Sequence, residues 1–242
     1  MSAENLSGRG EQSSPFNRSA QHQAKRAAIL SEAARLFNHK GSRATTLRDI
    51  AETLGLSKTS LYYYVSTKEE LIYQCYVAAL RHHDRVLDDI ESAHSEPLQR
   101  FSAFIMRHFE DWQAAQAGRA PHIAALLEIA ALKAPHRQEV EAQYIAIFKR
   151  LREFVRHGIA GGSIRPVEPT STILAVLGSL DWTFSWLRTI PTENVGATAD
   201  AALDLFTHGL FAGPGSYQPA KLVQPPITDT AMPGFNRGNR TG

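Results

Sequence analysis

Apolar residues recur at three- and four-residue spacing through the first ninety positions, which predicts a series of amphipathic helices. Four helices are expected, over residues 21–38, 47–54, 57–64 and from 66 to about 90. Gly41 provides an end signal for the first helix, and Thr46 and Ser57 are candidate N-caps for the second and third. Ser66 with Glu69 has the capping-box pattern and is expected to start the fourth.

The rest of the chain also follows a helical period. Further helices are expected near residues 101–112, 121–132, 140–151, 173–187 and 198–210. The segment 173–187 is apolar on nearly every side, so we expect it to be buried all round. Residues 161–166 form a strong break before it, and Gly213-Pro214-Gly215 is expected to stop the last helix.

The ends of the chain lack a hydrophobic period and are rich in Ser, Gly and Pro. They predict a disordered arm over residues 1–20 and a disordered tail over 213–242. No segment alternates like a strand, and no repeat of solenoid period occurs. The prediction is an all-α fold of about nine helices, with a three-helix head over 21–68 and a larger helical body over 69–212.

The second and third predicted helices have the spacing of a helix-turn-helix. This motif needs a small residue where its helices cross, a residue tolerant of the left-handed conformation in the turn, and apolar residues that lock the helices together. Ala51, Gly55, Leu56 and Leu61 occupy those places. The recognition helix would then begin with Lys58, Thr59 and Ser60, and this polar first turn would face the major groove of DNA.

The stretch TTLRDIAETLGLSKTSLYYYVSTKEELI, residues 45–72, resembles the N-terminal region of TetR-family repressors over nearly the whole of that domain. The resemblance implies phosphate contacts from Thr46, Tyr63 and Lys68, and contacts at or beside base edges from Lys58, Thr59, Ser60 and Tyr62. Thr46 and Lys68 also lie at helix N-termini, which favour phosphate. Arg48 is a further phosphate candidate, with a solvated side chain as the alternative. The three tyrosines could instead form an aromatic core cluster, and Tyr64 is the one expected to do so.

The distribution of charge supports a head that meets phosphate. Residues 1–75 carry ten Lys and Arg against seven Asp and Glu, whereas residues 76–212 carry thirteen against sixteen. No apolar run is long enough for a membrane helix and the first twenty residues lack a signal-peptide core, so a cytoplasmic, nucleoid-associated protein is expected. The single cysteine, Cys75, excludes a disulfide framework and is expected to act as a small hydrophobe.

An enzyme is not expected, and neither a cofactor nor a metal is predicted. His82, His83 and Asp84 are the densest cluster of potential ligands, but adjacent helical positions diverge by about 100° and cannot converge on one ion. No metalloprotease, hydrolase or phosphate-loop motif occurs. The partners expected are double-stranded operator DNA, a second copy of the chain and a small hydrophobic effector.

The body resembles the TetR-like regulators that respond to acyl-CoA thioesters, over the segments GGSIRPVEP and GSLDWTFSWLR. This resemblance implies an effector of that class. The side chains expected to line its cavity are Phe104, His108, Trp112, Tyr144, Phe148, Trp182 and Trp186, with ordinary core packing as the alternative for each. Arg188 could meet a CoA phosphate, with a solvated side chain as the alternative. The expected dimer contacts are Leu174, Leu177, Gly178, Ala201, Ala202 and Leu205. A DNA-binding protein without an effector, with an architectural role, is the alternative function.

Overall fold

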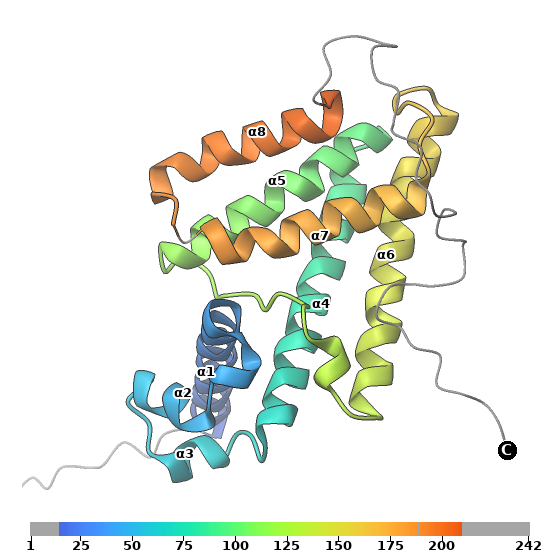
Figure 1. The fold of residues 1–242 in the computed structure, drawn as a ribbon. Coiled ribbons are helices and arrows are strands. Elements are labelled where there is room, and N and C mark those ends of the chain that lie inside the picture. Colours follow the sequence, from blue (N-terminus) through green and yellow to red (C-terminus); the bar gives the residue numbers. More distant parts are fainter. Residues whose placement is uncertain (1–14, 188, 210–242) are drawn as a thin grey trace, which may run out of the picture.

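A computed structural model describes residues 15–187 and 189–209, without the side chains of residues 15–18, 183–186 and 192. Eight α-helices and two short 3-10 helices make up this part of the chain, and no strand occurs in it (Figure 1). The helices are α1 (Pro15–Ala44), α2 (Leu47–Thr53), α3 (Lys58–Tyr62), α4 (Lys68–Ala93), α5 (Pro97–Gln116), α6 (His136–Ala160), α7 (Pro169–Leu187) and α8 (Val195–His208). The 3-10 helices are η1 (Ile129–Ala131) and η2 (Thr192–Asn194). The all-helical fold is confirmed.

Local capping defines the small helices of the head. The Thr46 hydroxyl accepts a hydrogen bond from the amide of Asp49 at 3.1 Å, and the Asp49 carboxylate accepts one from the amide of Thr46 at 2.9 Å. The Ser57 hydroxyl caps α3 by accepting a hydrogen bond from the amide of Ser60 at 3.1 Å, so both predicted N-caps are confirmed. The start of α4 was predicted one residue early, because Thr67 is its N-cap and accepts from the amide of Glu70 at 3.0 Å.

The turn between α2 and α3 has the predicted form. Gly55 adopts φ +63°, a conformation that strains any residue with a Cβ. Ala51 and Leu61 are buried, and Leu56 packs against the core, so the two helices are locked together as expected. Gly41, with φ 78°, interrupts α1 where the sequence predicts an end.

The long helix α4 joins the head to the body. It begins beside α3 and runs upward beside α6, while α5, α7 and α8 lie across the upper part of the molecule (Figure 1). The core is continuous from the head, where Ile29 and Leu71 are buried, into the body, where Phe109 and Leu151 are buried. None of the described helices is long and apolar enough to span a membrane.

Several predicted elements differ from the structure. Helix α1 begins at Pro15, inside the segment expected to be disordered, and α8 ends before Gly209, which has φ 77°. The helix predicted over 121–132 is wrong, because only η1 is helical there. The predicted disordered segments 1–14 and 213–242 lie outside the described residues.

Helix α7 is not buried all round within one chain, contrary to the prediction. Ile173, Val176 and Leu180 are buried against the body, but Gly178 and Trp182 are exposed. Trp182 has 63% of its surface exposed, which is a large apolar area to leave in water. The apolar residues of α7 therefore lie on two sides of the helix, one facing the core and one facing outward.

Candidate nucleic-acid interface and effector cavity

Helix α3 presents a short polar surface that is free of core contacts. Lys58, Thr59 and Ser60 are exposed, while Leu61 on the opposite side is buried. The Lys58 ammonium lies 5.7 Å from the centre of the Tyr62 ring, which is 44% exposed. The hydroxyls of Ser57 and Ser60 are 2.8 Å apart, so the Ser60 side chain is held at the start of the helix.

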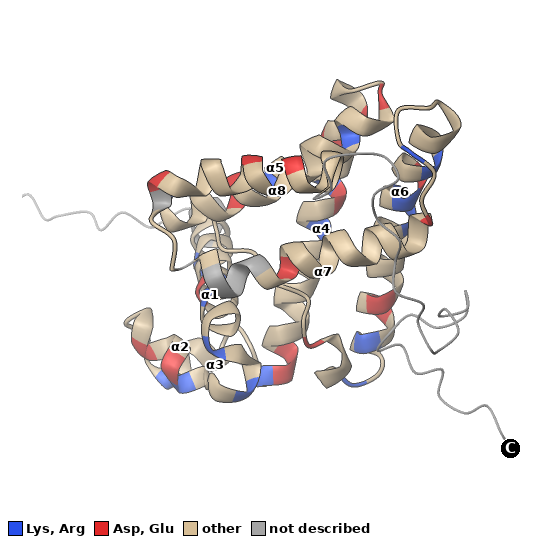
Figure 2. Ribbon diagram, turned by 45° about the horizontal axis from the view of Figure 1, so that its top comes forward, with Lys and Arg blue, Asp and Glu red and all other residues tan. Residues whose placement is uncertain are grey.

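Helix α2 adds two of the predicted phosphate candidates beside this surface. Thr46 is exposed, although its hydroxyl already accepts the capping hydrogen bond described above. Arg48 is exposed and its Nε donates to Glu52 at 2.6 Å. Because such a surface ion pair contributes little to stability, Arg48 can exchange Glu52 for another anion at small cost. Figure 2 shows this mixture of basic and acidic residues on α2 and α3.

Tyr63 and Tyr64 follow α3 and are oriented by an aromatic contact with α1. The Tyr64 ring is half-buried and stacks on His22, with their centres 4.8 Å apart. The Tyr63 ring packs edge-on against the rings of His22 and Tyr64 and remains 74% exposed. Tyr64 therefore takes the core role expected for one of the three tyrosines, and Tyr63 is positioned with its hydroxyl end free of the core.

Lys68 has a structural role that the sequence did not reveal. Its ammonium donates to the carbonyl of Ser42 at 2.7 Å and to that of Thr45 at 3.1 Å. These contacts satisfy two carbonyls between α1 and α2 and fix the start of α4 against them. A contact between Lys68 and a phosphate would have to use the third N–H of the ammonium.

A strap made of residues 120–128, between α5 and η1, takes the place of the predicted helix and is hydrogen-bonded to the head. Asn38 donates from Nδ2 to the carbonyl of Ile123 at 2.7 Å and accepts at Oδ1 from the amide of Ala125 at 2.9 Å. The amide of Glu128 donates to the Tyr76 hydroxyl at 3.1 Å. The strap thus forms its hydrogen bonds with α1 and α4 instead of within a helix.

The substitution Asn38→Ala is expected to lower the free energy of unfolding by about 1–3 kcal/mol, because two backbone groups of the strap lose their partners. Thermal or urea unfolding followed by circular dichroism measures the change. Lys40→Ala, an exposed substitution on the same helix, is the matched control. Equal stability of the two variants would contradict a structural role for the Asn38 contacts.

A small cavity lies in the body between α4, α5, α6 and α7. Its polar lining consists of His83, His108, Tyr144 and Asp181. His108 donates from Nε2 to the carbonyl of Leu180 at 3.0 Å. Within the described chain no hydrogen bond reaches the Asp181 carboxyl group. The remaining lining is apolar and comprises Leu80, Phe104, Leu126, Ile147, Leu177 and Leu180.

Burial disfavours charged groups in this cavity. It raises the pKa of Asp181 to about 7, and it lowers the pKa of His83 to about 3 and that of His108 to about 4. Both histidines are therefore neutral, and Asp181 can hold a proton and act as a hydrogen-bond donor. Such a lining suits an apolar molecule with one or two hydrogen-bonding groups.

The substitution Asp181→Asn is expected to stabilise the protein at pH 8 by about 1–3 kcal/mol and to leave its stability near pH 4 unchanged. The folded chain retains the Asp181 proton up to about pH 7, whereas the unfolded chain loses it near pH 4. Stability contributed by this proton is therefore present at low pH and is lost as the pH rises through this window. Melting temperatures measured at both pH values test this, and an equal effect at both would contradict it.

The predicted cavity residues have different locations. Phe104, His108 and Tyr144 line the body cavity, Trp112 lines a smaller adjoining one, and Phe148 is buried in the core. The prediction that Trp182 lines the cavity is wrong, because this side chain lies on the outer side of α7. The side chain of Trp186 and residue Arg188 lie outside the described part of the chain. Sequence reasoning missed His83 and Asp181, although Asp181 is the single charge of α7 and a lone charge in an apolar helix is a usable signal.

Three of the six predicted dimer contacts are exposed on α7 and α8. Gly178 and Ala201 are exposed, and Leu205 is 40% exposed. The other three, Leu174, Leu177 and Ala202, are half-buried and pack against the core. Cys75 is buried and its pKa is raised to about 12, which matches its predicted role as a small hydrophobe. No group of three potential metal ligands occurs among the residues that the structure describes.

Two family models match the chain. One, described as bacterial regulatory proteins of the tetR family, matches residues 29–75. The other, a tetracyclin repressor-like C-terminal domain, matches residues 94–210. Together they span most of the chain and include α3 and all residues that line the body cavity except Leu80 and His83.

Individual proteins show the same similarity. The uncharacterized HTH-type transcriptional regulator YfiR of Bacillus subtilis is 29% identical over 154 residues, which cover 63% of this chain and 75% of YfiR. The HTH-type transcriptional repressor KstR2 of Mycobacterium tuberculosis is 34% identical over 87 residues, or 36% of this chain and 44% of KstR2.

Solved structures match over a longer region. AibR, in complex with isovaleryl coenzyme A and operator DNA, has a TM-score of 0.62 at 25% identity over 77% of this chain and 100% of AibR. PfmR of Thermus thermophilus, a TetR family transcriptional regulator, has a TM-score of 0.61 at 29% identity over 76% of this chain and 98% of PfmR.

Proposed function

Because the chain belongs to the TetR family of bacterial regulatory proteins, we propose that it represses transcription and is released from its operator by a small hydrophobic effector. The observation that carries this proposal is the exposed first turn of α3, held by the Gly55 turn and the Ser57 cap in the geometry of a recognition helix. The family is one of transcriptional regulators, and an enzymatic activity is not part of the proposal. The protein would act in the cytoplasm, associated with the nucleoid.

In this proposal the residues 21–68 form the DNA-binding domain and 69–212 the effector-binding and dimerisation domain. Lys58, Thr59, Ser60 and Tyr62 lie at or beside base edges in the major groove. Thr46, Tyr63, Lys68 and Arg48 contact phosphates, which fix the position of the head without reading sequence. The exposure of Tyr63 beside α3 supports its role, since a phenol hydroxyl there can reach the DNA backbone.

The active form would be a homodimer paired through α7 and α8. A single recognition helix reads few bases, so a two-fold dimer that reads two half-sites is the expected solution, with a pseudo-palindromic operator. The exposed apolar side of α7, with Trp182 and Gly178, supports pairing there. On α8, Leu205 and Ala201 are also exposed.

The effector would occupy the body cavity, and an acyl-CoA thioester is the proposed class. AibR, whose structure holds isovaleryl coenzyme A, provides the analogy. The lining suits an acyl group because Phe104 and Leu177 are apolar and the nearby histidines are uncharged, and at about 30 Å³ the cavity has to widen to admit one. The Asp181 carboxyl group is available to a thioester carbonyl when protonated.

Selection of bound DNA from a random pool, followed by titration of acyl-CoA esters against the complex, tests the proposal. A pseudo-palindromic operator should emerge, and Tyr63→Phe should weaken its binding without lowering the melting temperature. A thioester should release the wild-type protein and raise its melting temperature in the absence of DNA. Failure to select any sequence would refute the regulator function, and an operator that no thioester releases would favour an effector-independent DNA-binding protein.

A further inference from the structure

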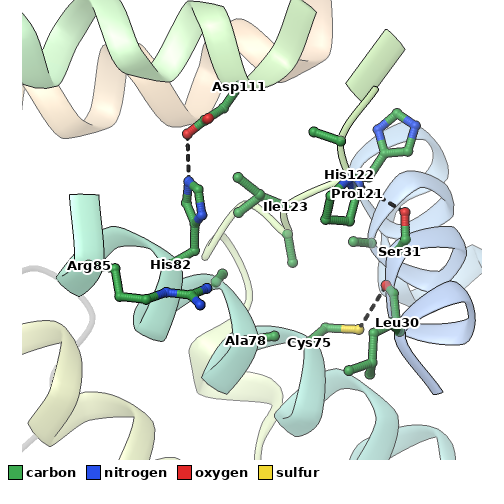
Figure 3. A pocket seen from close by; sticks show the side chains of 15 residues that line it. Leu30, Ser31, Cys75, Ala78, His82, Arg85, Asp111, Pro121, His122 and Ile123 are labelled. Carbon is green, nitrogen blue, oxygen red and sulfur yellow. Dashed lines mark hydrogen bonds and ion pairs between the residues drawn. The ribbon is translucent and has the colours of Figure 1, made fainter. Parts of the chain in front are cut away.

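Another cavity, of about 210 Å³ and larger than the body cavity, lies where the head meets the body (Figure 3). Helix α1 contributes Leu30 and Ser31, helix α4 contributes Cys75 and Ala78, and the first residues of the strap form the opposite wall. No residue of the cavity in the body lines this one. Ala78 is exposed at its rim, so the cavity opens to solvent.

The cavity is mostly apolar, with Ser31 and His122 on one side and His82, Arg85 and Asp111 at the opposite end. There, His82 Nε2 lies 2.6 Å from Asp111 Oδ2, and Arg107 Nε donates to Asp111 Oδ1 at 2.9 Å. Burial alone would raise the pKa of Asp111, but the hydrogen bonds from His82 and Arg107 outweigh it and hold the pKa below its usual value. The acidic group is thus already neutralised by its partners.

Arg85 supplies a positive charge at this end that has no anionic partner among the described residues. Its Nε donates to the carbonyl of Arg81 at 3.2 Å, and no hydrogen bond of the described chain uses its two terminal nitrogens. Figure 3 shows Arg85 beneath His82, on the same side of the cavity. A guanidinium with two free nitrogens matches the two oxygens of a carboxylate.

We infer that this cavity binds a compact apolar carboxylate, such as a monocyclic aromatic acid, with its ring among the side chains of α1, α4 and the strap and its carboxylate on Arg85. The size is suitable, because an apolar cavity of about 150 Å³ holds a benzene molecule and the rest of the space can take the acid group. The roof of the cavity is tied to α1, since the amide of His122 donates to the Ser31 hydroxyl at 2.9 Å. A molecule bound there would contact both helices that position the head.

Isothermal titration calorimetry of the full chain with benzoate tests this site. Benzoate should bind once per chain with a dissociation constant of about 1 mM or tighter, and benzyl alcohol, which lacks the charge, at least about tenfold more weakly. Arg85→Gln should weaken benzoate binding at least about tenfold. Arg81→Gln removes the same charge from an exposed residue outside the cavity and should leave binding unchanged.

Ala78→Phe should abolish binding, because it fills the cavity from its exposed rim without disturbing the core. Circular dichroism confirms that each variant is folded. The inference would be overturned by the absence of saturable binding or by binding that persists in Ala78→Phe. Loss of binding in Asp181→Asn but not in Ala78→Phe would locate benzoate in the body cavity and overturn it equally. Full affinity in Arg85→Gln would overturn the assignment of a carboxylate.

Discussion

The substitution Lys58→Glu is expected to weaken operator binding at least about 100-fold. It replaces a cation with an anion at the first position of α3, which faces the DNA in the proposed complex. In a dimer the change occurs on both heads, so two favourable contacts become two repulsive ones. The dependence of affinity on salt should also become shallower, because fewer counterions are released from the DNA.

The fold of the head should tolerate this change. Lys58 is exposed, has no ion pair within the described chain, and its ammonium lies over the Tyr62 ring. Glutamate in the first turn of a helix also interacts favourably with the helix dipole. The melting temperature should therefore stay close to that of the wild-type protein. Fluorescence anisotropy with a selected operator at several salt concentrations measures the loss of affinity.

Lys149→Glu is the matched control, since Lys149 is an exposed lysine on α6 in the body. It changes the net charge by the same amount and should alter operator affinity only slightly. If Lys58→Glu and Lys149→Glu bound the operator equally well, the first turn of α3 would not face the DNA. The docking assigned to Thr59 and Ser60 would then fail as well.

The head could be predicted from sequence because its determinants are local. The caps at Thr46 and Ser57 act within three residues, and Gly55 is required by the backbone of a single turn. Each of these signals agrees with the hydrophobic spacing around it. A local prediction is reliable when the capping residues, the turn residues and the hydrophobic pattern all favour the same structure. The role of Lys68 was missed because its carbonyl partners, Ser42 and Thr45, lie more than twenty positions away.

The strap could not be predicted in the same way. Residues 121–132 have a helical spacing of apolar side chains, but Asn38 and Tyr76 supply hydrogen bonds to their backbone from distant parts of the chain. Nothing in the local sequence reveals those partners. The cavity at the junction was missed for the same reason, because its walls come together only once α1, α4 and the strap are packed.

Helix α7 shows a different limit of sequence reasoning. Its composition predicted burial on every side, yet Gly178 and Trp182 are exposed in a single chain. A hydrophobic pattern predicts that a surface is buried. It does not distinguish burial within one chain from burial against a second copy. Trp182 was assigned to the cavity because a large aromatic side chain suits a hydrophobic effector, and its position on the outer side instead favours pairing.

The substitution Gly178→Glu is expected to raise the dissociation constant of the homodimer at least about 1000-fold, because burying an unpaired charge costs several kcal/mol. A Cβ added at Gly178 meets no atom within 4 Å, so the single chain has room for the new side chain. Glutamate also favours a helix over glycine by up to about 1 kcal/mol. The variant should therefore remain folded and become monomeric, and its operator affinity should fall because the two heads are no longer linked.

Analytical ultracentrifugation over a range of concentrations measures the change, and circular dichroism verifies the helix content. Ala146→Glu places the same charge at an exposed position on α6, outside the proposed interface, and should leave the dimer intact. Gly178→Ala adds a single methyl group and should have a much smaller effect than Gly178→Glu. A dimer of unchanged affinity in Gly178→Glu would exclude the outer side of α7 as the interface, and the exposed Trp182 would then need another partner.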